Sequence, residues 1–268
     1  ATMSFPVRLA PKYNYQIVAW ADIVVNGSDA DRLYKTTEGL DAIEIISDSW
    51  NAMDETRDAY TGTKYIANFS SGSDLSMDLT RPFAKVRVVA TDINDITDLG
   101  LSPKAAKVSY SQNMYTKYNA VTDEASAAEA KSHEYKTFPY DDAVGEMTLF
   151  ADYVFVPELG TAKFTLKVYD DEAYTRLIKE NSFSTEIFVE RNKITTIKGD
   201  VLTEGGNVSI KIENDLDELE TINYVDSATT LQEIINNIAD GESANITLGG
   251  DIVLGLSAST SSTQIGRA

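Results

Sequence analysis

The amino-acid sequence predicts an all-β protein built from β-sandwiches. Apolar and polar residues alternate over several short segments, and a period of two is typical of strands that turn one face to a core. Polar turns separate these segments, as they do in antiparallel sandwiches. The chain also has 14 tyrosines, whose rings pack well on a pleated sheet while their hydroxyls reach water.

The first predicted strand covers residues 16–25 (QIVAWADIVV), which are rich in β-branched and aromatic side chains. The clearest alternation follows at residues 81–90, which open with an Arg-Pro pair. One face of this run is formed by Ala84, Val86, Val88 and Ala90. Because proline has no N–H for a ladder, Pro82 should stand at the first residue of the strand or on an edge.

Three further segments predict strands in the second half of the chain. Residues 149–156 (LFADYVFV) form a β-branched and aromatic run. Residues 163–169 and 207–213 alternate cleanly. The predicted inward side chains are Phe164, Leu166, Val168, Val208, Ile210 and Ile212.

Helical signals are few. Residues 122–134 are rich in Ala and Glu, which predicts a short surface helix or a mobile loop. Residues 230–240 give a stronger signal, because Thr230 and Glu233 form a capping box. Leu231, Ile234, Ile235 and Ile238 then recur at helical spacing, and Gly241 stands where a helix stops.

The C-terminal region has a different organisation. Five acids in residues 213–220 indicate a linker or a boundary. Residues 244–255 contain two short strands around a Gly-Gly-Asp turn, and with the preceding helix they resemble the cap and first rungs of a right-handed parallel β-helix. The alternative is a small helical appendage to the sandwich. Residues 257–263 are of low complexity.

Composition excludes several classes of function. A length of 268 residues favours about two domains. The chain has no cysteine, which excludes disulfides, thiolate metal sites and cysteine nucleophiles. The net charge of −19 argues against binding nucleic acid or anionic lipid headgroups. No apolar run has the length of a membrane span, and the start at Ala1 lacks a signal peptide's features, so we expect a mature or truncated start.

The sequence predicts no catalytic residue, no cofactor and no metal ligand. The one histidine, His133, stands in a polar segment and is expected to be a solvated surface residue. Calcium is the metal that the acidic clusters could hold, but none has EF-hand spacing, and each is first interpreted as a turn or a solvated face. These clusters are Asp141-Asp142, Asp170-Asp171-Glu172 and residues 213–220.

Some aromatic residues could form a glycan platform. The candidates are Trp20, Trp50, Tyr60 and Tyr65. Trp20 lies in a predicted strand and is expected in the core, whereas Trp50 lies in a loop-like stretch and is the better candidate for a surface contact. The tripeptide Asp226-Ser227-Ala228 resembles an O-glycosylation acceptor.

Four motifs in order carry a resemblance to a known family. They are Tyr13 to Asp22 (YNYQIVAWAD), Arg57-Asp58-Ala59-Tyr60, Leu79 to Val86 (LTRPFAKV) and Arg191 to Thr203 (RNKITTIKGDVLT). Together they resemble the fimbrillin family, the type V pilins and related surface lipoproteins of Gram-negative anaerobes. The resemblance covers most of residues 1–213.

The resemblance implies two tandem transthyretin-like β-sandwich domains. Residues 1–92 would form the first domain, without its first strands, and residues 93–213 would form the second. Residues 220–268 would form a tail with the start of a parallel β-helix. Fimbrillins are exported to the outer membrane as lipoproteins and polymerise by strand exchange. A protease removes the first strand of one subunit, and a strand of a neighbour fills the groove, which is β-augmentation in physical terms.

These observations predict a non-enzymatic cell-surface fimbrial component. Because the tail departs from the usual donor strand, we expect an accessory or tip adhesin-like subunit whose partners are other pilin subunits and a host or microbial glycan or protein. One alternative is a surface protein whose sandwiches are spacers for a C-terminal β-helix with carbohydrate-active enzyme chemistry. Another is a glycan-binding lipoprotein that does not polymerise.

Overall fold

The computed structural model describes residues 7–23, 31–70, 75–136, 138, 140–141, 145–203, 208–214, 218–225 and 245–248. The chain divides into two compact units, Ala1–Thr221 and Ile222–Ala268. The predicted all-β class is confirmed, because strands dominate and the described residues contain a single α-helix, α1 (Ile93–Asp98). No helix in the described part is long and apolar enough to cross a membrane.

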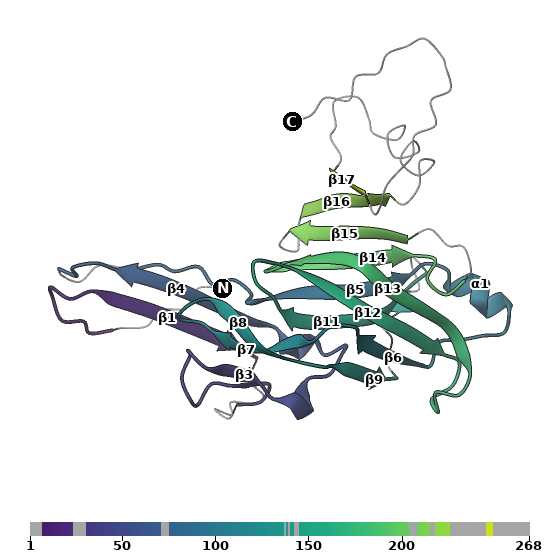
Figure 1. The fold of residues 1–268 in the computed structure, drawn as a ribbon, viewed down its shortest axis with the longest axis horizontal. Coiled ribbons are helices and arrows are strands. Elements are labelled where there is room, and N and C mark those ends of the chain that lie inside the picture. Colours follow the sequence, from purple (N-terminus) through teal and green to yellow (C-terminus); the bar gives the residue numbers. More distant parts are fainter. Residues whose placement is uncertain are drawn as a thin grey trace, which may run out of the picture. The chain divides into compact units, whose positions relative to one another are not determined.

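The first unit contains two facing sheets and a separate ribbon (Figure 1). Its strands are β1 (Tyr15–Asp22), β2 (Tyr34–Lys35), β3 (Ile43–Ile45), β4 (Ala59–Ile66), β5 (Phe83–Ala90), β6 (Ala105–Tyr110), β7 (Met114–Asn119), β8 (Glu124–Glu129), β9 (Ser132–Tyr135), β10 (Tyr140–Asp141), β11 (Glu146–Phe155), β12 (Leu159–Tyr169), β13 (Leu177–Glu190), β14 (Lys193–Gly199) and β15 (Val208–Asn214). In this unit the larger sheet runs β15-β14-β5-β11-β7-β3-β2, and the smaller one runs β13-β12-β6-β9.

Strand β5 is the predicted Arg-Pro strand, and it lies inside the larger sheet. It pairs in parallel with β14 and antiparallel with β11. Pro82 directly precedes its first residue, as expected, and all four residues of the predicted core face are fully buried. The strand therefore shares one sheet with strands that lie beyond residue 92. The division into tandem domains at residues 92 and 213 stays a prediction.

The core lies between the two sheets. Strand β12 contributes Phe164, Leu166 and Val168, all buried as predicted from the alternation. Strand β11 contributes Leu149, Phe150, Val154 and Phe155 from the facing sheet. The predicted strands at residues 149–156, 163–169 and 207–213 are confirmed as β11, β12 and β15.

Residues 122–134 form strands, so the predicted helix or mobile loop is wrong. Strand β8 pairs with β7, and β9 pairs with β6. Ala and Glu favour helices only weakly, and pairing with distant strands overrides that local preference. Ala127, with φ of 53°, interrupts the regular strand conformation within β8.

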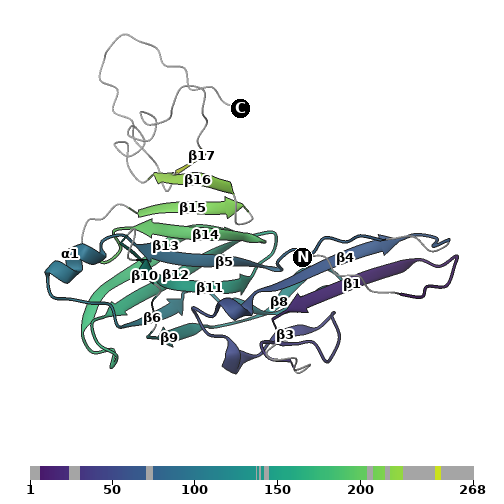
Figure 2. The same ribbon diagram turned by 180° about the vertical axis from the view of Figure 1, so that it is seen from behind.

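Strands β1 and β4 form a two-stranded antiparallel ribbon, from Tyr15 opposite Ile66 to Asp22 opposite Ala59. Figure 2 shows this ribbon reaching past the ends of the two sheets. Thr63, in the middle of β4, donates from Oγ1 to the carbonyl of Ala120 at 3.0 Å, and Gln16 on β1 donates from Nε2 to the carbonyl of Val121 at 2.9 Å. Both contacts hold the ribbon against the turn after β7.

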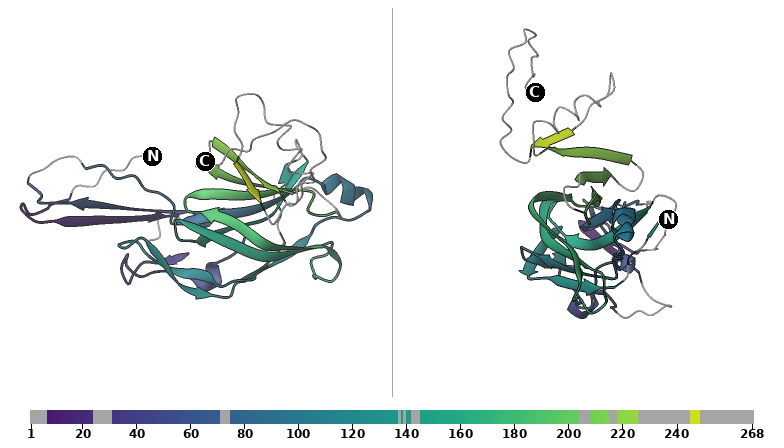
Figure 3. Two further views of the ribbon diagram at one scale, coloured as in Figure 1. Left: turned by 45° about the horizontal axis from the view of Figure 1, so that its top comes forward. Right: turned by 90° about the vertical axis from the view of Figure 1, so that its right-hand side faces the viewer.

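In the second unit the described residues contain a parallel strand pair, seen in Figure 3. It joins β16 (Glu218–Val225) and β17 (Asn245–Leu248), from Ile222 opposite Asn245 to Val225 opposite Leu248. The strand predicted from residue 244 is confirmed. Residues 213–214 and 218–220 lie in β15 and β16, so the prediction of a linker is wrong there. The alternative of a boundary agrees with the division between the two units, which follows directly after Thr221. The helix at 230–240, the Gly-Gly-Asp turn and the tripeptide 226–228 lie outside the described residues, and the β-helix stays a prediction.

Candidate functional site

The family motifs meet at one corner of the first unit, where β5 begins. The guanidinium of Arg81 donates two hydrogen bonds to the carboxylate of Asp58, Nε to Oδ1 at 2.7 Å and Nη2 to Oδ2 at 2.9 Å. It also bonds the hydroxyl of Tyr60 at 2.7 Å and lies 4.9 Å from the centre of that ring. This bidentate geometry fixes the start of β5 against the start of β4.

The motif at residues 191–203 closes this corner from the other side. Asn192 lies in the two-residue turn between β13 and β14, with φ of 62°, a conformation that Asn tolerates better than most residues. Its Oδ1 accepts a hydrogen bond from the backbone N–H of Arg81 at 3.0 Å. Its own backbone N–H donates to the carbonyl of Phe83 at 2.9 Å. The motifs at 57–60, 79–86 and 191–203 thus form one structural corner, although they are far apart in the sequence.

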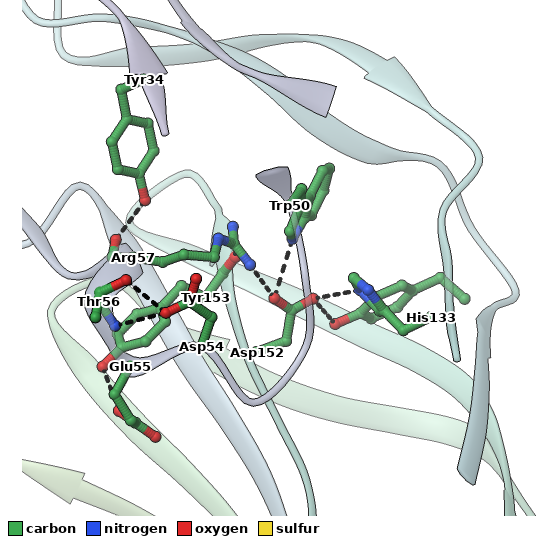
Figure 4. A network of polar contacts seen from close by, with 10 residues as sticks. Tyr34, Trp50, Asp54, Glu55, Thr56, Arg57, His133, Asp152 and Tyr153 are labelled. Carbon is green, nitrogen blue, oxygen red and sulfur yellow. Dashed lines mark hydrogen bonds and ion pairs between the residues drawn. The ribbon is translucent and has the colours of Figure 1, made fainter. Parts of the chain in front are cut away.

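A buried polar network lies beside this corner (Figure 4). Asp152, on β11, accepts hydrogen bonds from Trp50 Nε1 at 3.0 Å, from the Tyr110 hydroxyl at 2.8 Å and from His133 Nε2 at 3.1 Å. It also forms an ion pair with Arg57, whose Nη2 donates to the carbonyl of residue 153 at 2.8 Å. The network joins three strands to the loop that carries the motif at residues 57–60.

The electrostatics of this network favour a fixed charge pair. Burial by itself would raise the pKa of Asp152, but the adjacent Arg57 and His133 hold this pKa well below its ordinary range. Burial and the charge of Asp152 raise the pKa of Tyr110. Because the carboxylate is enclosed and accepts four side-chain donors, we assign the network to stabilising the core and not to chemistry on a substrate.

Two predictions about individual side chains are wrong. His133 is buried and hydrogen-bonded, not solvated, because β9 pairs with β6 and places it opposite Val108. Trp50 is buried between sheets, not a surface contact, because its indole N–H binds Asp152. Trp20, expected in the core, is half-buried and packs against the core from the ribbon.

One residue in the sequence signals the buried network. Asp152 interrupts the otherwise apolar run LFADYVFV, and a carboxylate inside a buried strand needs a charged or hydrogen-bonding partner. That partner could not be identified from the sequence, because Arg57 lies in a short 3-10 turn (Glu55–Arg57) remote in the chain.

Of the acidic clusters, the one at Asp170 and Asp171 stabilises a turn. Asp171 accepts hydrogen bonds from the Thr175 N–H, the Thr175 hydroxyl and the Arg176 N–H, which lower its pKa to about 2. Asp170 pairs with Arg176 at 3.0 Å, and Asp141 lies in β10. In the described part of the chain, no three His, Cys, Asp or Glu side chains gather in a group that could hold a metal ion.

A shallow pocket of about 260 Å³ opens next to the motif corner. Its floor is a cross-strand row in which Tyr153 and Ile194 flank Lys85. The remaining lining residues are Ile23, Glu55, Asp58, Arg81, Asn192 and Lys193. Of the predicted platform aromatics, Tyr60 lies under Arg81 at the corner and Tyr65 is exposed on the ribbon, so they do not form one surface with the buried Trp50.

The outer edge of β1 is open among the described residues, since β1 pairs only with β4. Thr61 exchanges backbone hydrogen bonds with Thr80, at 2.8 and 2.9 Å, so its backbone groups point away from β1. Its partner Trp20 must then belong to a non-hydrogen-bonded pair and turn its own N–H and C=O outward. By the same alternation Gln16, Val18 and Asp22 also turn their backbone groups outward.

The indole N–H of Trp20 adds a second unsatisfied group at this edge. Its Nε1 is buried and makes no hydrogen bond of good geometry among the described residues, although the Asp22 carboxylate is an acceptor near it. A buried donor without a partner costs about 1–3 kcal/mol in desolvation. The edge therefore combines unpaired backbone groups with an unsatisfied side-chain donor.

Comparison with solved structures found remote similarities. A candidate cell adhesion protein from Bacteroides ovatus is 16% identical, with a TM-score of 0.45, over 79% of this chain and 71% of that one. Candidate polysaccharide-binding proteins from Bacteroides thetaiotaomicron are 14% identical, with a TM-score of 0.44, over 77% of this chain and 75% of that one. A fimbrial assembly protein from Parabacteroides distasonis is 15% identical, with a TM-score of 0.34, over 62% and 56%.

The search among curated proteins gave no match. A family model described as "Family of unknown function (DUF6562)" matches residues 1–240, and the chain therefore belongs to the DUF6562 family.

Proposed function

We propose that this chain is a non-enzymatic, cell-surface fimbrial component that assembles by β-strand complementation. Its role would be that of an accessory or tip adhesin-like subunit, exported as a lipoprotein to the outer membrane. The observation that carries the proposal is the open edge of β1. Unpaired N–H and C=O groups along a strand are a template for a strand from another chain.

The side chains at this edge support the same interpretation. Val18 and Trp20 pack against the core and are only half-buried, so part of their apolar surface is open. An added strand would cover that surface and could bring an acceptor to the indole N–H of Trp20. Other pilin subunits are the partners that this geometry favours.

The tail fits a subunit at the end of a fibre. A parallel pair such as β16 and β17 needs a crossover connection, as each rung of a parallel solenoid does. We propose that residues 220–268 begin a β-helix, and that residues 1–92 and 93–213 form two transthyretin-like sandwiches. The sandwiches would then carry assembly and the tail would carry contact with a target.

The test removes one outward-facing amide. Gln16 is exposed, and Gln16→Pro deletes its N–H without removing a hydrogen bond between β1 and β4. Gln16→Ala is the matched control, because it also loses the side-chain bond to the carbonyl of Val121 but keeps the N–H. We expect the purified chain and the Ala variant to form oligomers that resist cold SDS, and the Pro variant to form at least tenfold fewer.

A second measurement uses the absence of native cysteine. A thiol introduced by Gln16→Cys should become protected from maleimide on assembly, whereas one introduced by Glu172→Cys, an exposed site in another loop, should stay reactive. The proposal fails if the chain stays monomeric at high concentration, if a folded Gln16→Pro variant assembles like the Ala variant, or if the thiol at residue 16 stays reactive in the oligomer.

A further inference from the structure

The pocket beside the motif corner contains a cation that is almost enclosed. The side chain of Lys85 is 13% exposed, and its Nζ lies 5.1 Å from the centre of the Tyr153 ring. A buried ammonium needs an anion close by, because desolvating an unpaired charge is costly. The floor of the pocket is thus built to hold a negative group.

That negative group is at present Glu55. Its Oε2 accepts from Lys85 Nζ at 2.5 Å and from the Tyr153 hydroxyl at 2.8 Å. The Glu55 side chain is 61% exposed and belongs to the short 3-10 turn, so it can swing into solvent. An exposed carboxylate therefore covers a nearly buried cation.

The second cation of the pocket is held differently. Arg81 and Asp58 are each 15% exposed and are joined by two parallel hydrogen bonds, with Tyr60 as a third partner. Displacing Asp58 would break a bidentate pair that also fixes the start of β5. Of the two carboxylates, Glu55 is the one that a ligand can replace.

We propose that Lys85 and Tyr153 form a binding site for the carboxylate of a sugar acid at the end of a glycan, and that Glu55 occupies this site until the sugar displaces it. This site is independent of strand complementation at β1. A single ring-sized unit fits, because the cavity of about 260 Å³ lies below the roughly 300–1,000 Å³ typical of pockets for drug-sized ligands.

The walls suit a sugar ring. Ile23 and Ile194 offer apolar surface to its C–H groups. The side-chain Oδ1 of Asn192 accepts a hydrogen bond from the backbone N–H of Arg81. Its side-chain NH₂ makes no hydrogen bond within the described residues and can donate to a hydroxyl of the sugar. A terminal sugar acid is favoured over an acidic polymer, because a chain of net charge −19 repels a ligand with many carboxylates.

The test compares methyl β-D-glucuronide with methyl β-D-glucoside, which differ in the carboxylate, by NMR titration of the full chain. We expect the glucuronide to bind and the glucoside not to bind. Lys85→Met should weaken glucuronide binding at least tenfold, about what losing one charge-assisted hydrogen bond costs. Glu55→Gln should strengthen it several-fold, because it removes the internal competitor.

Glu38→Gln is the matched control, since Glu38 is another exposed carboxylate paired with a lysine, Lys35, outside the pocket. It should leave binding unchanged. The proposal is overturned if Glu55→Gln weakens binding or leaves it unchanged, or if the glucoside binds equally well. Equal binding of N-acetylglycine would also overturn it, because the site would then accept a peptide carboxylate and not a sugar acid.

Discussion

Arg57 and Asp152 form an ion pair inside the core, although 95 positions separate them in the sequence. Their side chains are 1% and 0% exposed. Because both charges are enclosed, solvent cannot replace either partner, so the pair holds the loop of the motif at residues 57–60 onto β11. This contact explains why a motif with two adjacent charges, Arg57 and Asp58, can serve two different strands at once.

The first prediction concerns removal of one partner. Asp152→Asn should lower the free energy of unfolding by roughly 3–5 kcal/mol, because it leaves the Arg57 guanidinium buried without a counter-charge. Urea denaturation followed by fluorescence of Trp50, which donates to the same carboxylate, measures the change.

The control for this substitution is Glu44→Gln. Glu44 pairs with Lys117 at 3.4 Å on the surface, where an ion pair contributes about 0–1 kcal/mol. If Asp152→Asn is no more destabilising than Glu44→Gln, the buried pair does not contribute to stability as we infer.

The second prediction follows from the depressed pKa of Asp152. A carboxylate whose pKa is lower in the folded state contributes stability that is fully present above its unfolded pKa of about 3.9. As the pH falls below that value, the unfolded state takes up the proton first and the contribution is lost. The difference in unfolding free energy between the natural chain and Asp152→Asn should therefore shrink between about pH 5 and pH 3. A difference that stays constant over this range would contradict the assignment.

The strands could be predicted from the sequence because their signal is local. Alternation in β5 and β12 shows directly which side chains face a core, and Phe164, Leu166 and Val168 lie where the period places them. The predicted position of Pro82 follows from the missing N–H of proline. The alternation relates residues two positions apart, and the effect of proline concerns a single residue. Both signals can therefore be found without knowing which distant segments pair.

The buried network could not be predicted, because its signals are long-range. His133 and Trp50 stand in polar or loop-like stretches, and only the pairing of β9 with β6 and the contact with Asp152 bury them. The open edge of β1 is likewise invisible in the sequence. The edge is open because the backbone of Thr61 bonds to Thr80 and not to β1. That choice depends on where the chain near Thr80 runs, which the local sequence does not show.

The third prediction concerns the turn at Asn192, in the motif at residues 191–203. Asn192→Ala should lower the free energy of unfolding by about 1–3 kcal/mol, since alanine tolerates φ of 62° poorly and lacks the acceptor for the Arg81 N–H. Asn192→Gly relieves the backbone strain but not the lost acceptor, so it should lie between alanine and the natural residue. Asn192→Asp keeps the acceptor and should be the mildest. An alanine variant as stable as the natural chain would exclude a role for the turn in holding β5.

The fourth prediction concerns Gly62, on the ribbon next to Thr61. A Cβ at Gly62 would lie 2.7 Å from the carbonyl oxygen of Asp78 and 2.8 Å from a methyl group of Leu79. Both distances are too short for carbon, so Gly62→Ala should push residues 77–79 away from β4 and break the paired bonds between Thr61 and Thr80. We expect a loss of about 1–3 kcal/mol and amide hydrogen exchange at least tenfold faster at Thr61 and Thr80.

Lys64→Ala is the control for this change, because Lys64 is exposed on the same strand and should alter stability by less than about 0.5 kcal/mol. The exchange data also test the inferred direction of the open edge. If the Thr61 amide stays protected in Gly62→Ala while the Thr80 amide is released, Thr61 bonds β1 and not Thr80, and the assignment of Gln16, Val18, Trp20 and Asp22 as the outward-facing positions of β1 must be reversed. If that amide is protected and Gly62→Ala releases it while the pairing of β1 with β4 persists, the outward edge of β1 is as inferred.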